Sequence, residues 1–132
     1  MDKKQESIKN LIDLFIALGH EQASNNDIIK LKLYIQQDGI SLYSGEPIEL
    51  YRLFENYYCQ IDHILPISKS NNDMFANKTL CFAEENQDKG DKLPSQWMSN
   101  RKKFTEFKKR VMKIRDVIGF EKVNNFLSDR IG

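Results

Sequence analysis

The chain has 132 residues, of which 40% are hydrophobic and 30% charged, and its formal net charge is +1. This length suffices for one domain with its own core, and the composition is that of a globular protein. No apolar run is long enough to span a membrane, and the first ten residues, MDKKQESIKN, lack the apolar stretch of a signal peptide. We therefore expect one domain over residues 1–132, monomeric and cytoplasmic, with no membrane association.

Charge is distributed unevenly along the chain. Residues 99–132 carry ten basic and four acidic side chains, whereas the preceding residues are net negative. A protein that binds nucleic acid unaided usually has a stronger basic excess, because neutralising phosphates supplies most non-specific affinity. If this domain acts on DNA, we expect another component to deliver the substrate.

Hydrophobic periodicity predicts a mostly helical chain with one pair of strands near its centre. In chain order we expect a helix over 6–19, a helix over 25–39, a short strand and turn over 40–48, helical turns over 49–56, a strand at 59–65, a polar loop at 68–73, a strand at 78–83, a short helix over 83–90, and helices from Pro94 to the end. The arrangement is a strand–loop–strand–helix unit held between helices.

The long C-terminal helix has two different faces. An apolar face follows from residues three and four apart, namely Phe104, Phe107, Val111, Ile114 and Ile118. The opposite side is basic and carries Arg101, Lys102, Lys103, Lys108, Lys109, Arg110 and Lys113. This side is either solvated or contacts duplex phosphates. We take Arg101, Lys102 and Lys109, together with Lys78, as candidate nucleic-acid-binding residues.

The residues around the central strands have the chemistry of a phosphodiesterase. Asp62 and His63 lie on the first strand, Asn77 ends the loop, and Asn86 and Lys89 lie on the short helix. Mg²⁺ takes oxygen ligands, so one carboxylate and one amide suffice when a DNA phosphate completes the shell. An imidazole can act as general base on water, and a lysine can stabilise charge on phosphorus. Together they predict metal-assisted phosphodiester hydrolysis.

Other interpretations of the same residues are weaker. An Asp-His dipeptide alone is common, and its ordinary role is an ion pair on a surface strand. No serine lies in a glycine-flanked nucleophile turn, and Cys59 and Cys81 have no zinc-ligand spacing with either histidine, so we expect two free thiols. We expect His20 to be exposed after a helix end, and Asp73 to give only polar support to the loop.

The combined spacing resembles a known family. His63, Asn77 and Asn86 follow at intervals of 14 and 9 residues, Lys89 follows three later, and the stretches LYIQQDG, LYSGEPI and IDHILP precede or contain them. From about Leu31 to Pro94 this pattern is similar to the HNH nuclease domain of the type II CRISPR RNA-guided DNA endonuclease.

The resemblance implies a fold and a site. The fold is an α+β, mostly helical one, in which a ββα-metal core at about 57–90 contains a short two-stranded antiparallel hairpin flanked by helices. Asp62 and Asn86 would be the metal ligands, His63 the general base and Asn77 the residue that orders the loop. Lys89 would lie near the scissile phosphate as a catalytic cation.

The resemblance also implies a cofactor and partners. The cofactor would be Mg²⁺, for which Mn²⁺ can substitute, and the substrate would be the DNA strand paired to the guide RNA. The chain would be a domain excised from a much larger endonuclease, and the remainder of that protein would be its partner. Phage inhibitor proteins that cover the same face in relatives are further candidate partners.

Two positions depart from the family pattern. Gln60 stands where relatives usually have an acidic residue, and Ser41 replaces a common cysteine. The loss of a charge at Gln60 could weaken metal binding or alter the surroundings of His63. Two alternatives therefore stay open: a stand-alone HNH endonuclease, and an HNH-like binding module whose catalytic site has decayed.

Overall fold

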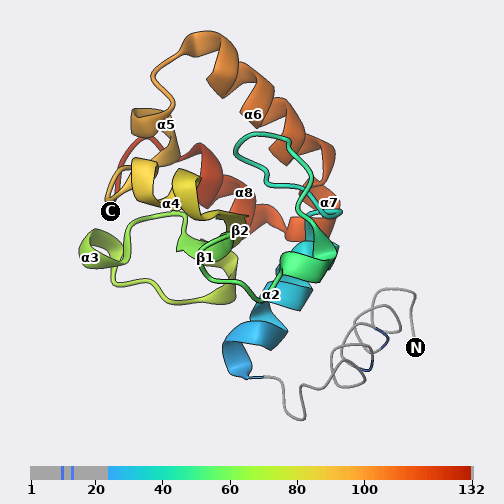
Figure 1. The fold of residues 1–132 in the computed structure, drawn as a ribbon. Coiled ribbons are helices and arrows are strands. Elements are labelled where there is room, and N and C mark those ends of the chain that lie inside the picture. The colour runs from blue at the N-terminus through green and yellow to red at the C-terminus, as the bar shows by residue number, and fades with distance from the viewer. Residues whose placement is uncertain (1–9, 11–12, 14–23, 132) are drawn as a thin grey trace.

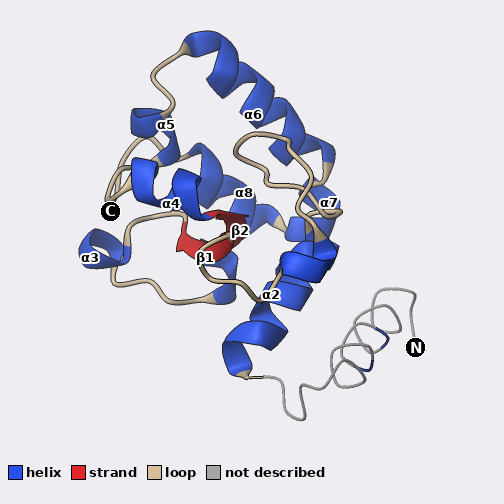
Figure 2. Cartoon of the chain, viewed as in Figure 1, coloured by secondary structure: helices blue, strands red, loops and turns tan. Residues whose placement is uncertain are grey.

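The computed structural model describes residues 10, 13 and 24–131 (Figures 1 and 2). The helix expected over 6–19, apart from Asn10 and Asp13, and the candidate His20 lie outside the described residues. The elements are α2 (Asn25–Gln36), η1 (Leu50–Arg52), β1 (Cys59–His63), α3 (Ile67–Ser70), η2 (Phe75–Asn77), β2 (Lys78–Phe82), α4 (Ala83–Lys89), α5 (Pro94–Trp97), α6 (Arg101–Lys113), α7 (Arg115–Ile118) and α8 (Phe120–Leu127).

The two predicted central strands form an antiparallel hairpin. β1 pairs with β2 in a register that places Asp62 opposite Thr79 and His63 opposite Lys78. The outer edge of β2 is closed by a side chain, because the Gln37 amide accepts from Leu80 N and donates to Leu80 O. This amide substitutes for a third strand and covers an edge that would otherwise be unpaired. The predicted mostly helical fold with one two-stranded hairpin is confirmed.

α2 confirms the predicted second helix, which begins at Asn25 as expected and ends earlier than expected, at Gln36. Ser24 caps it, since its hydroxyl accepts from Asp27 N while Asp27 Oδ2 accepts from Ser24 N. Gln37 is the C-cap of the helix, and the chain reverses through Gly39 at φ +73°, a conformation that favours glycine.

Two predictions about connections need correction, and one holds. Residues 40–48 form a loop closed by one isolated bridge between Ile40 and Pro47, where the proline has no N–H to extend the pairing. The helical turn expected over 49–56 is present as the 3-10 helix η1. The expected polar loop contains the short helix α3, which ends at a left-handed Asn71.

The hydrophobic core consists of two clusters that meet at the hairpin. The larger cluster contains Leu42, Tyr43, Ile64, Cys81, Phe107, Val111, Ile118, Val123 and Phe126. The smaller contains Leu31, Leu33, Ile48, Leu53, Cys59 and Leu80. Because adjacent residues of a strand face opposite sides, Leu80 and Cys81 supply different clusters. Cys59 and Cys81 are buried free thiols, as predicted.

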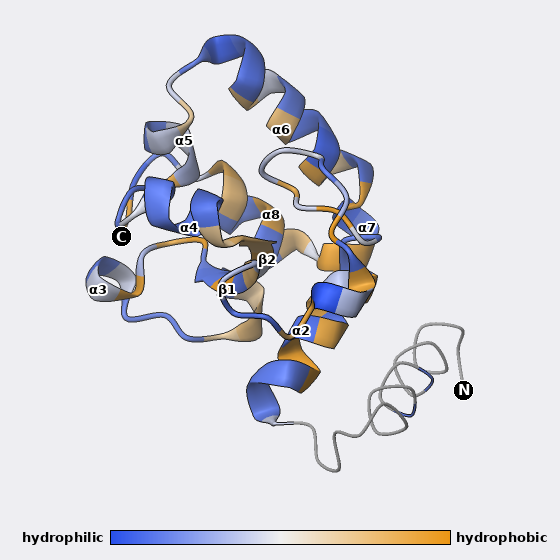
Figure 3. Cartoon of the chain, viewed as in Figure 1, coloured by the Kyte–Doolittle hydropathy of each residue, from blue (hydrophilic) through white to orange (hydrophobic). Residues whose placement is uncertain are grey.

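The C-terminal helices cover one side of the hairpin, with α6 packed on α8 (Figure 1). The predicted apolar face is confirmed, but it spans two helices, since α6 ends at Lys113 and α7 runs from Arg115 to Ile118. Phe107 and Val111 are fully buried, and Figure 3 shows hydrophobic residues at intervals along the mostly hydrophilic ribbon of α6. Burial of this face holds the helix against the domain.

Candidate active site

The site lies where α4 crosses one face of β1. Gln60 and Asp62 are two residues apart on the strand, so both side chains point to the same face. Asn86 and Lys89 are three residues apart on α4, so they share one side of that helix. Two pairs result: Asn86 Nδ2 donates to Gln60 Oε1 at 2.8 Å, and Lys89 Nζ lies 3.2 Å from Asp62 Oδ2.

Both polar contacts that the described residues make with the Asp62 carboxylate use the same oxygen, Oδ2. Its Oδ2 accepts from the Tyr43 hydroxyl at 2.6 Å and pairs with Lys89 Nζ, and only 5% of the residue is exposed. Burial raises the pKa of the Asp62 carboxyl, while the Lys89 ammonium and the Tyr43 hydrogen bond oppose this rise. The Tyr43 phenol has a pKa well above its ordinary value, because it is buried beside this carboxylate.

Lys89, which the resemblance predicts to lie near the scissile phosphate, lies in the interior of the domain. The side chain is fully buried, and Nζ donates to the His63 carbonyl at 3.0 Å in addition to its pair with Asp62. A cation enclosed by protein cannot contact a phosphate. Lys89 instead neutralises Asp62 and ties α4 to the end of β1, because its single buried charge has an ionic and a carbonyl acceptor.

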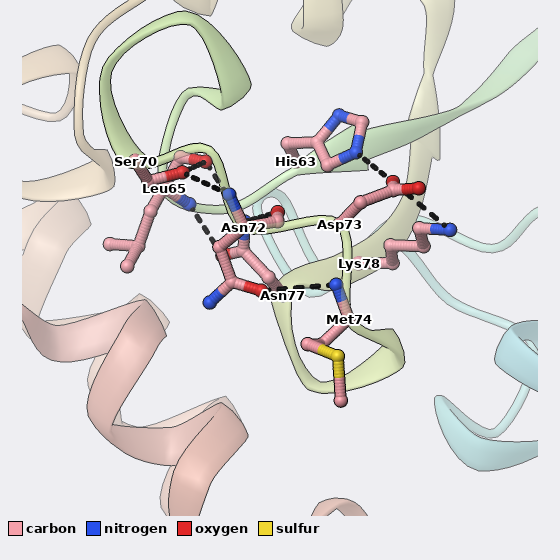
Figure 4. A network of polar contacts seen from close by, with 8 residues as sticks. All are labelled: His63, Leu65, Ser70, Asn72, Asp73, Met74, Asn77 and Lys78. Carbon is pink, nitrogen blue, oxygen red and sulfur yellow. Dashed lines mark hydrogen bonds and ion pairs between the residues drawn. The ribbon is translucent and has the colours of Figure 1, made fainter.

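His63 points to the opposite face, toward the loop (Figure 4). Its Nε2 lies 2.8 Å from Asp73 Oδ1, and Lys78 Nζ lies 3.3 Å from the same oxygen. A carboxylate accepts only, so a hydrogen bond here places the proton on Nε2 and leaves Nδ1 as the basic nitrogen of a neutral ring. Hydrogen bonds from His63 and then from Lys78 lower the pKa of Asp73.

Asn77 fastens the loop that follows β1 (Figure 4). The residue is fully buried; its Oδ1 accepts from Leu65 N, and its Nδ2 donates to Leu65 O and Asn72 O. These contacts give the loop a fixed path between the strands, as expected for a residue that orders it. His63 and Asp73 flank the segment from Leu65 to Asn72 that Asn77 holds, so the contact between them depends on these hydrogen bonds.

Ser41 and Glu85 anchor the start of α4. Glu85 Oε1 accepts from the Ser41 hydroxyl at 2.7 Å and from Phe82 N at 2.9 Å. The serine that replaces the family's common cysteine therefore has a defined role, since it fixes the glutamate that caps the helix. Asn86 follows directly, so this anchor sets the position of its side chain.

Three predicted residues meet at one open pocket of about 190 Å³. It is lined by Ile61, Asp62, His63, Pro66, Ile67, Ser68, Asn86, Gly90 and Asp91. A second pocket of about 450 Å³ adjoins it, since His63 and Asn86 line both, and it also includes Lys78. The fold therefore collects Asp62, His63 and Asn86 from two elements and places Lys78 beside them.

The residues present fit a hard divalent cation. Among the described residues, the side-chain hydrogen bonds of Asp62 all involve Oδ2 and those of the Asn86 side chain all involve Nδ2. No buried side-chain oxygen in the described part of the chain lacks a partner, so the Oδ1 atoms of both residues are accessible to solvent. One carboxylate and one amide oxygen at an open pocket match the oxygen ligands that Mg²⁺ prefers, with water or phosphate completing the shell.

The other candidate nucleic-acid-binding residues lie elsewhere. Arg101, Lys102 and Lys109 are exposed on α6, and none of the described residues of this helix lines either pocket. Only Lys78 shares the surface of His63. Arg110, on the same helix, is used structurally, because its guanidinium donates to the Leu42 and Tyr43 carbonyls.

The sequence did not indicate which residues contact and orient Asp62 and His63. Tyr43 lies 19 positions before Asp62, in a turn with no nucleotide or metal motif, and its role appears only when the turn packs against β1. Asp73, for which the sequence predicts only polar support of the loop, contacts the histidine itself. The sequence could have indicated that Gln60 lies at the site, because it precedes Asp62 by two residues and side chains two apart on a strand share one face.

Comparison with known proteins identifies relatives of this region. The HNH endonuclease family model matches residues 41–95. The chain is 38% identical to the CRISPR-associated endonuclease Cas9 of Staphylococcus aureus over 89 aligned residues. It is 36% identical to the CRISPR-associated endonuclease Cas9 of Campylobacter jejuni over 77 aligned residues. The match covers 64% and 58% of this chain, respectively, and 8% of each relative.

Comparison of the fold with solved structures also finds Cas9 proteins. A crystal structure of Streptococcus thermophilus Cas9 in complex with an AGGA PAM superposes with a TM-score of 0.77 at 25% identity, covering 96% of this chain and 13% of that one. The resemblance inferred from the motifs is thus confirmed, and the chain spans less than a tenth of the length of the curated relatives it matches. In the described part of the chain, no helix combines the length and apolarity needed to cross a bilayer.

Proposed function

We propose that the chain carries an HNH nuclease domain and hydrolyses the backbone of the DNA strand paired to a guide RNA, because residues 41–95 match the HNH endonuclease family model and the chain is similar to Cas9 endonucleases. In this proposal His63 is the general base, and Asp62 and Asn86 hold one Mg²⁺, for which Mn²⁺ can substitute. The longer endonuclease that contains such a domain would supply the guide RNA and the rest of the DNA-binding surface, in the bacterial cytoplasm.

The observation that carries the proposal is the shared pocket. Asp62, His63 and Asn86 line it together, and the oxygens suited to a metal are the ones left accessible. A buried ion pair made only for stability does not require the residues Asp62, His63 and Asn86 to line the same open pocket. The family match supports the same reaction class.

The contact between His63 and Asp73 supports the role that we propose for each residue. Nδ1 of His63 takes a proton from water as the water oxygen forms a bond to phosphorus and the bond from phosphorus to the leaving sugar oxygen breaks. The leaving oxygen is then protonated by solvent. Asp73 holds the ring through Nε2 and stabilises the positive charge that the imidazole acquires.

The remaining residues support charge and position. A bound Mg²⁺ would polarise the phosphate and stabilise negative charge on it. Asp62 is held ready for this role by Tyr43 and Lys89, which occupy its other oxygen. Lys78 faces the second pocket and is positioned to attract DNA phosphate, while Asn77 keeps the intervening loop in place.

The decisive experiment is strand-specific cleavage by the guide-loaded parent endonuclease. We expect His63→Ala to slow cutting of the guide-paired strand by about 100-fold or more, the usual contribution of a general base, without loss of guide or target binding. Tyr51→Ala, whose side chain is 80% exposed, is the control and should cut normally. Undiminished cutting of that strand by His63→Ala would refute the assignment of the base.

Two further cleavage assays test the alternatives. Robust cutting of free duplex DNA by the 132-residue chain alone would favour a stand-alone endonuclease. Unchanged cutting of the guide-paired strand by Asp62→Ala, in a chain that binds no divalent metal, would favour a decayed binding module. Gln60 gives the decayed module little support, because its amide is bonded to the proposed ligand Asn86.

A further inference from the structure

Gln60 connects the backbone of one segment to the proposed metal ligand through two directional hydrogen bonds. Its Nε2 donates to the Asn56 carbonyl at 2.8 Å, and its Oε1 accepts from Asn86 Nδ2 at 2.8 Å. Gln60 and Asn86 are both partly buried, and both line the second pocket. The side chain therefore forms a bridge that begins at a fixed carbonyl and ends at the amide of Asn86.

The polarity of this bridge is determined by its first member. A backbone carbonyl can only accept, so it requires the NH₂ end of the Gln60 amide and turns the oxygen end toward α4. That oxygen in turn requires the NH₂ end of Asn86. The Asn86 oxygen must then face away from Gln60, and it is the atom with no hydrogen-bond partner among the described residues.

We propose that Gln60 is a positioning residue that fixes the Asn86 side chain with Oδ1, rather than Nδ2, presented to a divalent cation. The proposal rests on the proposed function, in which Asn86 is a metal ligand. The two ends of an asparagine amide have nearly the same shape, but only the oxygen can coordinate Mg²⁺. Reversal of Asn86 would leave two hydrogen-bond acceptors, Oδ1 and Gln60 Oε1, facing each other.

The same bridge explains how a neutral residue serves this strand position. A glutamate there would also accept from Asn86 Nδ2, but it could not donate to the Asn56 carbonyl. Its carboxylate would instead add negative charge beside the metal. Glutamine therefore keeps the orientation of Asn86 and gives up the charge, so Gln60→Glu should preserve metal binding, whereas an apolar residue of similar length should not.

The test is a Mg²⁺ titration of the 132-residue chain by NMR, in which the side-chain amide of Asn86 and the backbone amides near Asp62 are followed. We expect Gln60→Met to weaken binding about tenfold or more, as is typical when a residue supporting a metal ligand is lost. Gln60→Glu should bind at least as tightly as the wild type. Gln87→Met, an equivalent change at an exposed position beside Asn86 in α4, should bind like the wild type.

Orientation is measured separately in metal-free protein. In the wild type, the Asn86 NH₂ protons should show nuclear Overhauser contacts to Gln60 and slow solvent exchange, and both should be lost in Gln60→Met while the β1 and α4 backbone shifts persist. Binding by Gln60→Met within about twofold of the wild type, or an equal loss in Gln60→Glu, would overturn the proposal. Wild-type protein that retains the contacts but shows no saturable shift near Asp62 would instead overturn the metal site of the proposed function.

Discussion

The loop between β1 and β2 and the C-terminal helices are stabilised in different ways. In the loop, residues 64–77, three side-chain hydrogen bonds converge on the single residue Asn77. In the helices, aromatic rings pack in a cluster where the Phe107 ring centroid lies 5.7, 5.9 and 5.5 Å from those of Tyr43, Phe104 and Phe126, respectively. The first region depends on directional contacts, and the second on apolar area.

This difference separates rigidity of the site from stability of the domain. Dispersion and burial are spread over many atoms, so no single contact in the helical cluster determines its geometry. The buried Asn77 amide makes three hydrogen bonds, and removing it would leave Leu65 N, Leu65 O and Asn72 O without this partner. Substitutions in the helices should therefore change global stability, whereas those in the loop should change local order around His63.

The largest expected effect on stability is that of Phe107→Ala. Its ring is fully buried, so truncation should lower the free energy of unfolding by about 3–5 kcal/mol in urea denaturation. Phe120→Ala is the matched control, since Phe120 is 81% exposed and should change stability by less than about 0.5 kcal/mol. If Phe107→Ala disturbed the NMR resonances of His63 and Asp73 more than those of α6 and α8, rigidity of the site would not be separate from stability of the domain.

Asn77→Ala should have a smaller global and a larger local effect. The Leu65 amide loses its acceptor, which costs about 1–3 kcal/mol. Hydrogen exchange should accelerate at Leu65 and in the loop while α6 and α8 remain protected. Asn71→Gly is the control, because Asn71 has a left-handed conformation (φ +52°) that glycine adopts easily. Equal acceleration in both regions would mean that the loop is not separately ordered.

The sequence predicted regular elements better than connections. Periodicity identified both strands, α4 and the apolar face of α6, because local spacing determines these features. It failed at 40–48, where the short loop around Gly45 is closed by one bridge instead of a ladder.

For the site, the motif spacing indicated Asp62, His63 and Asn86, which the structure brings to one pocket. It did not indicate that Lys89 is buried against Asp62, or that Tyr43 contacts the same carboxylate. The partners of these two residues are set by tertiary packing: α4 crosses β1, and the turn at Tyr43 folds onto the strand. Burial of a lysine beside a carboxylate cannot be read from the spacing along a helix.

Lys122 joins the two regions and gives a pH-dependent prediction. It lies on α8, donates to Gln36 at 2.6 Å and lies 4.3 Å from the centroid of the Phe75 ring. Burial lowers the pKa of Lys122 from 10.5 to about 7. The unfolded chain thus binds this proton more tightly, so stability should rise as pH increases above about 7, up to the unfolded pKa.

The measurement is chemical denaturation across this pH range. Between about pH 6 and pH 8 the contribution of Lys122 should increase stability by about 1 kcal/mol. Lys122→Met should remove that part of the pH dependence, while Lys113→Met, at an exposed position of α6, should retain it. An identical pH profile in Lys122→Met and the wild type would show that the lysine is solvated or equally charged in both states.

The smallest stability effect is expected on the basic side of α6, where only function can distinguish two roles. Lys102→Gln with Lys109→Gln should change stability by less than about 0.5 kcal/mol, because both side chains are exposed. If this side binds DNA phosphates in the parent endonuclease, the slope of log affinity against log salt should fall by about 1 for each phosphate that the double variant no longer neutralises. Lys78→Gln is the comparison, since Lys78 lines the pocket of His63 and Asn86. A reduced slope in Lys78→Gln alone would place the phosphate-binding surface at the site and leave α6 as a solvated helix that stabilises the domain through its opposite face.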